Sequence, residues 1–235
     1  SGILTRMTRP IVVSDMDGTL TTAETWRGVH QWILANARTA AASRFIAVRL
    51  PIVFLARSGF MNKERFRARW LEDQTKLLRG VPSEQLTAMG EWVVKNYLWP
   101  ARRVHAVSAV QAAHAAARAT DPRAELVLAT GGYQPIAEAF AKELDATIAL
   151  GTPFEMHDGV ATGRLAAPTQ SGEEKARAAL ACAAGGRILA AFGDTAADIP
   201  LLRLAERPIA VEPDRALQRV ALAGGWEILS DVVSR

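Results

Sequence analysis

Two carboxylates separated by one residue follow a short apolar segment near the start of the chain. The segment Val12-Val13-Ser14 has the composition of a buried parallel strand, and Asp15, Met16, Asp17 and Gly18 come directly after it. In open α/β sheets, ligands bind outside the carboxyl ends of the strands. Two acids at such a place, with a glycine that turns the chain, predict an oxygen-ligated metal ion and a carboxylate nucleophile.

Three later turns carry groups that suit the same chemistry. Thr130-Gly131-Gly132 opens a predicted helix, where a hydroxyl and backbone N–H groups would bind phosphate. Lys175 lies in the first turn of another predicted helix. Gly193-Asp194, followed by Asp198, comes directly after a predicted strand that ends at Phe192.

Together these residues provide what phosphoryl transfer needs, which is a nucleophile, in-line positioning and charge neutralisation. We predict that Asp15 is the nucleophile and that Asp15 and Asp194 hold a magnesium ion. Asp17 would protonate the leaving oxygen and then activate the hydrolytic water. The threonine turn and the lysine would bind the phosphoryl oxygens as their charge develops.

The elements that position these residues alternate between helix and strand after about residue 104. The predicted strands cover 125–129, 146–150, 187–192, 208–211 and 226–229. Such alternation predicts an α/β core with a parallel sheet and right-handed crossovers. Residues 155–162 predict a hairpin that turns at Asp158-Gly159, and Ser171 with Glu174 predicts a capping box.

The first strand and the rest of the core are separated by a region that shows only helical patterns. The predicted helical stretches cover about 22–42, 44–56, 62–78 and 83–97. We therefore expect an α/β core made of residues 1–20 and 106–235, with an all-helical cap of residues 21–105 inserted after the first strand.

The composition is that of a globular protein, with 49% hydrophobic and 22% charged residues among 235. The net charge of +4 is spread along the chain, which favours a solvated surface over a nucleic-acid interface. The single cysteine, Cys182, excludes an intrachain disulfide.

Since no run has the length of a signal peptide or a membrane span, we expect a soluble cytoplasmic protein, either a monomer or a homodimer. The apolar stretch 44–57 could be buried in the cap, form a dimer contact or lie on a membrane surface.

The motifs, taken in order, resemble those of the haloacid dehalogenase-like (HAD) phosphatase superfamily. Thr130-Gly131-Gly132-Tyr133 is close to the Ser-Gly-Gly-Phe of the phosphoserine-phosphatase-like branch, and Asp158-Gly159-Val160-Ala161-Thr162-Gly163 is close to its Asp-Gly-x-x-Thr-Gly hairpin. The resemblance implies a Rossmann-like HAD fold with a helical cap. It also implies Mg²⁺ as the cofactor and an aspartyl-phosphate intermediate.

The resemblance also assigns roles to single residues. The implied metal site consists of Asp15, Asp17, Asp194 and Asp198, and the implied catalytic residues are Asp15, Asp17, Thr130 and Lys175. Phosphate and substrate contacts are implied for Gly18, Thr19, Gly131, Gly132, Glu24 and Gln74.

Two positions depart from the pattern of that branch. Gln74 stands where the branch has an arginine that clamps the carboxylate of phosphoserine, and Ala197 stands where it usually has asparagine. A neutral amide does not replace the bidentate charge of a guanidinium. A shifted register would let Arg69 or Lys76 take that place instead. Both departures disfavour phosphoserine as the substrate, and neither affects the phosphoryl chemistry.

Each motif also has a purely structural interpretation. Asp15 and Asp17 could form a turn, Lys175 could be solvated, Asp198 could cap a helix and Glu24 could be an ordinary acid of a first helical turn. We predict a Mg²⁺-dependent phosphomonoester hydrolase that acts on a small phosphorylated metabolite. The alternatives are phosphoserine phosphatase proper, a phosphotransferase to an acceptor alcohol, and a non-catalytic relative that binds a ligand or a membrane.

Overall fold

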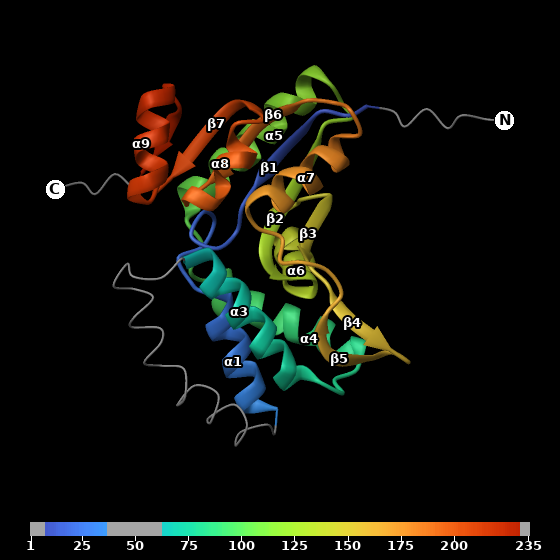
Figure 1. Cartoon of the computed structure of the whole chain (residues 1–235). Coiled ribbons are helices and arrows are strands. Elements are labelled where there is room, and N and C mark those ends of the chain that lie inside the picture. The colour runs from blue at the N-terminus through green and yellow to red at the C-terminus, as the bar shows by residue number, and fades with distance from the viewer. Residues whose placement is uncertain (1–7, 37–62, 231–235) are drawn as a thin grey trace.

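The computed structural model describes residues 8–36 and 63–230, so the apolar stretch 44–57 lies outside the described residues (Figure 1). The centre of the fold is a six-stranded sheet in the order β3-β2-β1-β6-β7-β8. Its strands are β1 (Ile11–Ser14), β2 (Glu125–Tyr133), β3 (Ile148–Thr152), β6 (Ile188–Gly193), β7 (Ala205–Val211) and β8 (Glu227–Leu229). All neighbouring strands of this sheet run parallel, which confirms the predicted α/β class.

Helices cover both faces of the sheet (Figure 1). They are α5 (Val104–Thr120), α6 (Gln134–Leu144), α7 (Gly172–Ala183), α8 (Ile199–Leu202) and α9 (Arg215–Gly224). The two faces of β1 are buried in different apolar clusters. Val12 packs in the cluster that contains residues of α5 and α6. Ile11 and Val13 pack in the cluster that contains residues of α7, α8 and α9. This two-sided burial explains why β1 is an uninterrupted apolar run.

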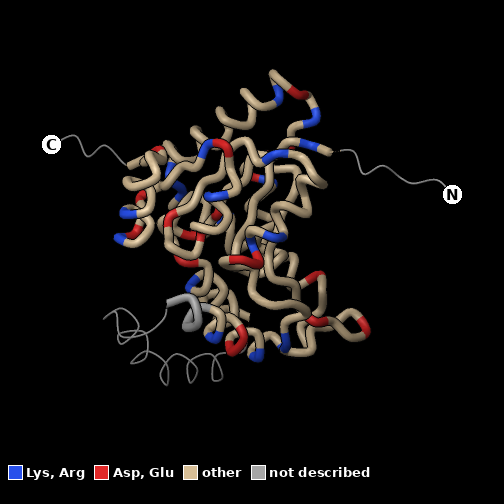
Figure 2. Tube along the Cα trace, turned by 45° about the horizontal axis from the view of Figure 1, so that its top comes forward, with Lys and Arg blue, Asp and Glu red and all other residues tan. Residues whose placement is uncertain are grey.

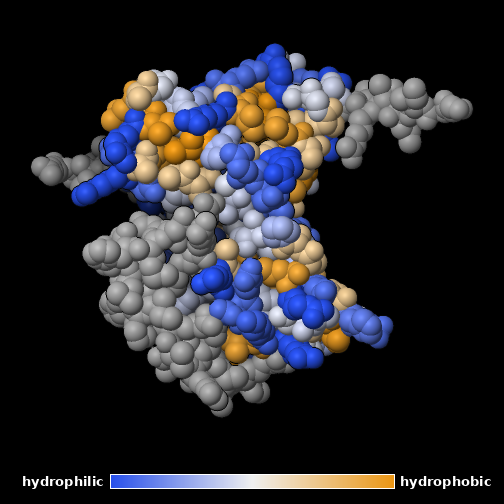
Figure 3. Space-filling view, in the orientation of Figure 1, coloured by the Kyte–Doolittle hydropathy of each residue, from blue (hydrophilic) through white to orange (hydrophobic). Residues whose placement is uncertain are grey.

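The helical cap is inserted between β1 and α5, beyond the carboxyl end of the sheet (Figure 1). Its elements are α1 (Thr25–Ala35), α3 (Lys63–Thr75), η1 (Lys76–Leu78), α4 (Ser83–Val93) and η2 (Val94–Leu98). In the space-filling view the core and the cap form two lobes that meet at a narrower waist (Figure 3). Helix α4 packs closely on α6, because a Cβ at Gly90 would lie 2.3 Å from the carbonyl oxygen of Pro135. The expected division at residues 105 and 106 stays a prediction, and it falls in the first turn of α5.

A hairpin of β4 (Phe154–His157) and β5 (Val160–Leu165) extends from the core toward the cap. Its turn has positive φ at both central residues, 49° at Asp158 and 76° at Gly159, as a tight two-residue hairpin requires. The cap adds a short extended segment to this hairpin. The N–H of Gly80 donates to the carbonyl of Ala161 at 2.7 Å, and the N–H of Ala161 donates to the carbonyl of Val81 at 2.9 Å.

Two local predictions differ from the structure. Strand β2 continues through Tyr133 instead of ending at residue 129, because Tyr133 pairs with Thr152 of β3. The predicted capping box is wrong, since Ser171 is the N-cap of α7 but its side chain makes no capping hydrogen bond. A capping box is found instead between Thr195 and Asp198.

Among the described helices, none has the length and apolarity to cross a bilayer. Basic and acidic residues are interspersed along the described trace (Figure 2).

Candidate active site

The sheet order brings three of the sequence motifs to one edge. Strand β1 lies between β2 and β6, and all three run in the same direction. Asp15 follows β1, Thr130 lies in the last part of β2, and Asp194 follows β6. Because the carboxyl ends of parallel neighbours meet, side chains from the start, middle and last third of the chain lie together.

A buried lysine joins two of the carboxylates. The Nζ of Lys175 donates to Oδ1 of Asp15 at 2.6 Å and to Oδ1 of Asp198 at 2.7 Å. Burial raises the pKa of Asp15 to about 6, although the Lys175 cation acts in the opposite direction. Burial disfavours the charge on Lys175, but the two carboxylates outweigh it and raise its pKa above the ordinary value. The lysine therefore stays a cation.

A third carboxylate, that of Asp194, completes the group. One oxygen from each of Asp15, Asp194 and Asp198 lies within 4.8 Å of the others. The hydroxyl of Thr19 lies 3.1 Å from Oδ2 of Asp15 and 3.0 Å from Oδ1 of Asp194. Clustered carboxylate oxygens are the ligands that Mg²⁺ prefers. We call these three residues the three-carboxylate group, and its chemistry fits the predicted ion.

Gly18 allows the close approach of Asp194. Its φ is +91°, and a Cβ at this position would lie 2.1 Å from Oδ2 of Asp194. Any larger residue would meet the carboxylate and adopt an unfavourable backbone conformation. The glycine of the first motif is therefore needed for the geometry of the three-carboxylate group.

Asp198 has a structural role as well as its contact with the lysine. Its Oδ2 accepts from the N–H and the hydroxyl of Thr195, each at 3.1 Å. Burial opposes the charge on Asp198, but Lys175 and these hydrogen bonds outweigh it and lower its pKa. Asp198 thus closes the capping box of the 3₁₀ turn η3 (Ala196–Asp198), and it makes no side-chain cap on the following helix α8, which contains Pro200.

The side chain of Asp17 does not belong to the three-carboxylate group, so its predicted part in metal binding stays a prediction. Its Oδ1 accepts from the N–H of Thr25 at 3.0 Å and from the Thr25 hydroxyl at 2.6 Å. The hydroxyl of Thr130 donates to its Oδ2 at 3.4 Å. The N–H of Gly132 donates to the Thr130 hydroxyl at 3.0 Å, so in this structure that N–H is directed at the threonine. Asp17 thus lies between the first cap helix and β2.

The predicted substrate residues of the cap have different surroundings. The carboxylate of Glu24 pairs with Arg27 at 2.6 Å on the surface. Gln74 is fully buried, and its Nε2 donates to the carbonyl of Trp26 at 2.9 Å. The structure therefore places Gln74 beside the first turn of α1, where Thr25 contacts Asp17. It does not bring the Glu24 carboxylate into the three-carboxylate group.

Two residues that the sequence did not mark as functional connect the cap to the site. Thr25 holds Asp17, and the buried Tyr133 hydroxyl donates to the carbonyl of Leu71 in α3 at 3.0 Å. The same Tyr133 hydroxyl accepts from the Thr75 hydroxyl at 3.1 Å. Burial raises the pKa of Tyr133, so it stays a neutral phenol. The sequence offered one signal for each of these roles. Thr25 lies in the first turn of a predicted helix, and Tyr133 stands where the resemblance has phenylalanine.

We expect Tyr133→Phe to lower stability without changing the fold. The change removes one buried hydroxyl that ties α3 to the end of β2, which should cost about 1 kcal/mol and roughly 2–4 °C in Tm. Thermal denaturation measures the effect. Tyr97→Phe is the matched control, since no hydrogen bond of the Tyr97 hydroxyl is found among the described residues. An equal loss of Tm in both variants would contradict the role of Tyr133.

The sequence is similar to those of several known proteins. A protein of Mycobacterium leprae provisionally named a hydrolase is 31% identical over 163 residues, which is 64% of this chain and 50% of that protein. Phosphoserine phosphatase SerB1 of Mycobacterium tuberculosis is 34% identical over 119 residues, 49% of this chain and 39% of that protein. The chain therefore spans half or less of the length of these relatives.

Solved structures show the same fold. A protein of unknown function from Bordetella pertussis superposes with a TM-score of 0.72 at 24% identity, covering 95% of this chain and 99% of that one. A probable phosphoserine phosphatase from Vibrio cholerae superposes with a TM-score of 0.59 at 19% identity, covering 90% and 58%. The sequence profile of the haloacid dehalogenase-like hydrolases matches residues 12–203. This match covers most of the chain, which therefore belongs to the haloacid dehalogenase-like hydrolase family.

Proposed function

We propose that this chain is a Mg²⁺-dependent phosphomonoester hydrolase that acts through an aspartyl-phosphate on Asp15. The observation that carries the proposal is the buried contact of Lys175 with Asp15 and Asp198, beside the carboxylate of Asp194. Burying charges is costly unless they are paired, and a protein without this chemistry has no need to assemble them at a sheet edge. A catalytically silent relative is therefore disfavoured.

In the proposed reaction, an oxygen of Asp15 attacks phosphorus while the bond to the leaving oxygen breaks. Asp17 gives its proton to that leaving oxygen. Asp17 then takes a proton from water as the water attacks phosphorus, which releases phosphate and restores the Asp15 carboxylate. Lys175 holds Asp15 in place through the 2.6 Å contact and adds positive charge beside the transferred group. A Mg²⁺ ion held by Asp15 and Asp194, with Asp198 nearby, would neutralise charge on the phosphoryl oxygens.

The proposed substrate is a small phosphorylated metabolite. Phosphoserine is the second candidate, because one relative is named a phosphoserine phosphatase. The buried neutral amide of Gln74, bonded to the carbonyl of Trp26, supports a substrate other than phosphoserine. Transfer of the phosphoryl group to an acceptor alcohol uses the same intermediate and remains an alternative. A cytoplasmic location belongs to this proposal as well.

Phosphate release from an aryl phosphate, measured with and without Mg²⁺, tests the proposal. We expect activity with Mg²⁺, its loss on adding a chelator and its return when Mg²⁺ is restored in excess. A panel of phosphorylated metabolites that includes phosphoserine and lipid phosphates identifies the substrate, and added alcohols reveal transfer as new phosphate esters. Phosphate release that is unchanged after complete chelation would contradict the proposed metal dependence.

A further inference from the structure

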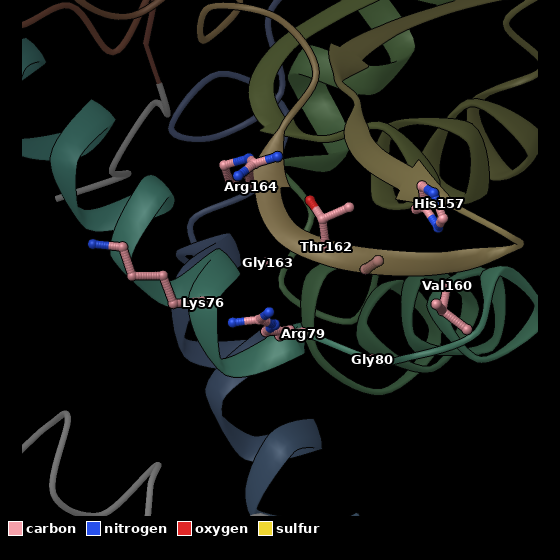
Figure 4. A pocket seen from close by; sticks show the side chains of 9 residues that line it. Lys76, Arg79, Gly80, His157, Val160, Thr162, Gly163 and Arg164 are labelled. Carbon is pink, nitrogen blue, oxygen red and sulfur yellow. The ribbon is translucent and has the colours of Figure 1, made fainter.

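A cavity of about 690 Å³ lies where η1 of the cap meets β5 of the hairpin (Figure 4). None of the residues that line it belongs to the candidate active site. Three of them are basic: Lys76 and Arg79 come from the cap, and Arg164 comes from β5. Figure 4 shows Arg79 and Arg164 on opposite sides of Thr162 and Gly163 in the strand. Cations from two separate segments thus line one cavity.

The counter-ions of Lys76 and Arg164 lie outside the cavity lining. Lys76 pairs with Asp73 at 2.6 Å, and Arg164 pairs with Glu155 at 2.8 Å, but neither carboxylate lines the cavity. The side chains of Lys76 and Arg164 are 70% and 75% exposed. Exposed ion pairs contribute little free energy, so Lys76 and Arg164 can turn to an anion that enters the cavity.

The floor of the cavity is already assembled by the backbone. Gly163 has a φ of +85°, and a Cβ there would lie 3.0 Å from the Cβ of Arg79, so the glycine lets η1 approach the strand. The hydrogen bonds of Gly80 and Val81 with Ala161, at 2.7 and 2.9 Å, hold the two segments together. A site that is formed before binding loses less conformational entropy when the ligand arrives.

We propose that this cavity is a second anion site, which binds the phosphate group of a phosphorylated molecule. Guanidinium groups match phosphate with paired hydrogen bonds, and the volume is typical of small-molecule sites. Val160 and Ala161 in the lining would contact the carbon part of the ligand. The ligand would touch Arg79 of the cap and Arg164 of the hairpin at once. Its binding therefore stabilises the attachment of the cap to the core, independently of the chemistry at Asp15.

Calorimetric titration with inorganic phosphate, in buffer with a chelator, tests the site. We expect the wild-type protein to bind phosphate and the variant Arg79→Gln/Arg164→Gln to bind it at least about tenfold more weakly. The control is Arg123→Gln/Arg207→Gln, which removes two exposed arginines paired with Asp121 and Glu227 elsewhere on the surface. The control should bind like the wild type. Equal binding by all three proteins would overturn the proposal.

Two further measurements separate the outcomes. Thermal denaturation without phosphate should give the same Tm for all three proteins, because the substituted side chains are exposed. Added phosphate should raise Tm least in Arg79→Gln/Arg164→Gln.

Flotation with phosphatidylcholine vesicles, with and without phosphatidic acid, identifies the source of the phosphate. Binding only to the acidic vesicles, lost in that variant, assigns a lipid headgroup. Binding of free phosphate without vesicle binding assigns a soluble molecule. The proposal would be overturned if the wild-type protein bound neither inorganic phosphate nor the acidic vesicles.

Discussion

Asp15→Asn is expected to abolish phosphate release, with a loss of roughly 10³-fold or more, because the amide cannot form the covalent intermediate. The substitution keeps the size of the side chain and leaves an oxygen that can accept from Lys175, so the fold should be retained. Steady-state release of phosphate from an aryl phosphate with saturating Mg²⁺ measures the effect. Asp158→Asn, at a side chain that is 89% exposed, is the matched control and should keep full activity.

The same substitution should stabilise the protein in the absence of metal. Burial raises the pKa of Asp15 to about 6, so at pH 7.5 the folded state holds a carboxylate that would be more stable in water. Asparagine removes that charge, and Tm should rise by roughly 2–4 °C for each kcal/mol gained. The difference should shrink as the pH falls through about 6, because wild-type Asp15 then takes up a proton and becomes neutral. A lower Tm for Asp15→Asn at pH 7.5 would show that the charge of Asp15 is not a net cost to folding.

Gly18→Ala should weaken Mg²⁺ binding and lower activity together, by roughly 10- to 100-fold in apparent affinity. Its Cβ would lie 2.1 Å from Oδ2 of Asp194, so the loop or the carboxylate must move away from Asp15. The activity measured as a function of Mg²⁺ concentration gives the apparent affinity.

Gly225→Ala controls for backbone strain alone. Gly225 has a φ of +65°, and a Cβ there would meet no atom within 4 Å. This variant should lose some stability, through the strained backbone, and should keep the Mg²⁺ dependence of the wild type. If Gly18→Ala also kept that dependence, the contact between Gly18 and Asp194 would have no part in metal binding.

The features that were predictable from sequence depend on local pattern and on one rule of sheet geometry. A buried apolar strand followed by Asp15, and another followed by Asp194, could be placed together because the carboxyl ends of neighbouring parallel strands share one edge. The hairpin turn at Asp158 was predictable because few residue pairs accept positive φ at both positions.

The features that were not predictable depend on how the cap docks on the sheet edge. Thr25 bonds to Asp17, eight positions away, and Tyr133 bonds to Leu71, 62 positions away. These contacts form only when the cap docks on the core. The position of Asp17 outside the three-carboxylate group follows from the same contact with Thr25. The Gly-Gly pair of residues 131 and 132 predicted a turn that ends the strand, but Tyr133 pairs with Thr152 of β3, so residues 130–132 form an irregularity within β2.

Chemical trapping of the phosphorylated enzyme tests most directly whether Asp15 is the nucleophile. The protein is mixed with an aryl phosphate and Mg²⁺, quenched in acid during turnover and reduced with borohydride, which converts an aspartyl-phosphate to homoserine. Peptide mass spectrometry then locates the change. We predict homoserine at position 15, none at position 17, and none at either position in Asp15→Asn. Modification at Asp17 or Asp194, or turnover with no modified carboxylate, would contradict the proposed role of Asp15.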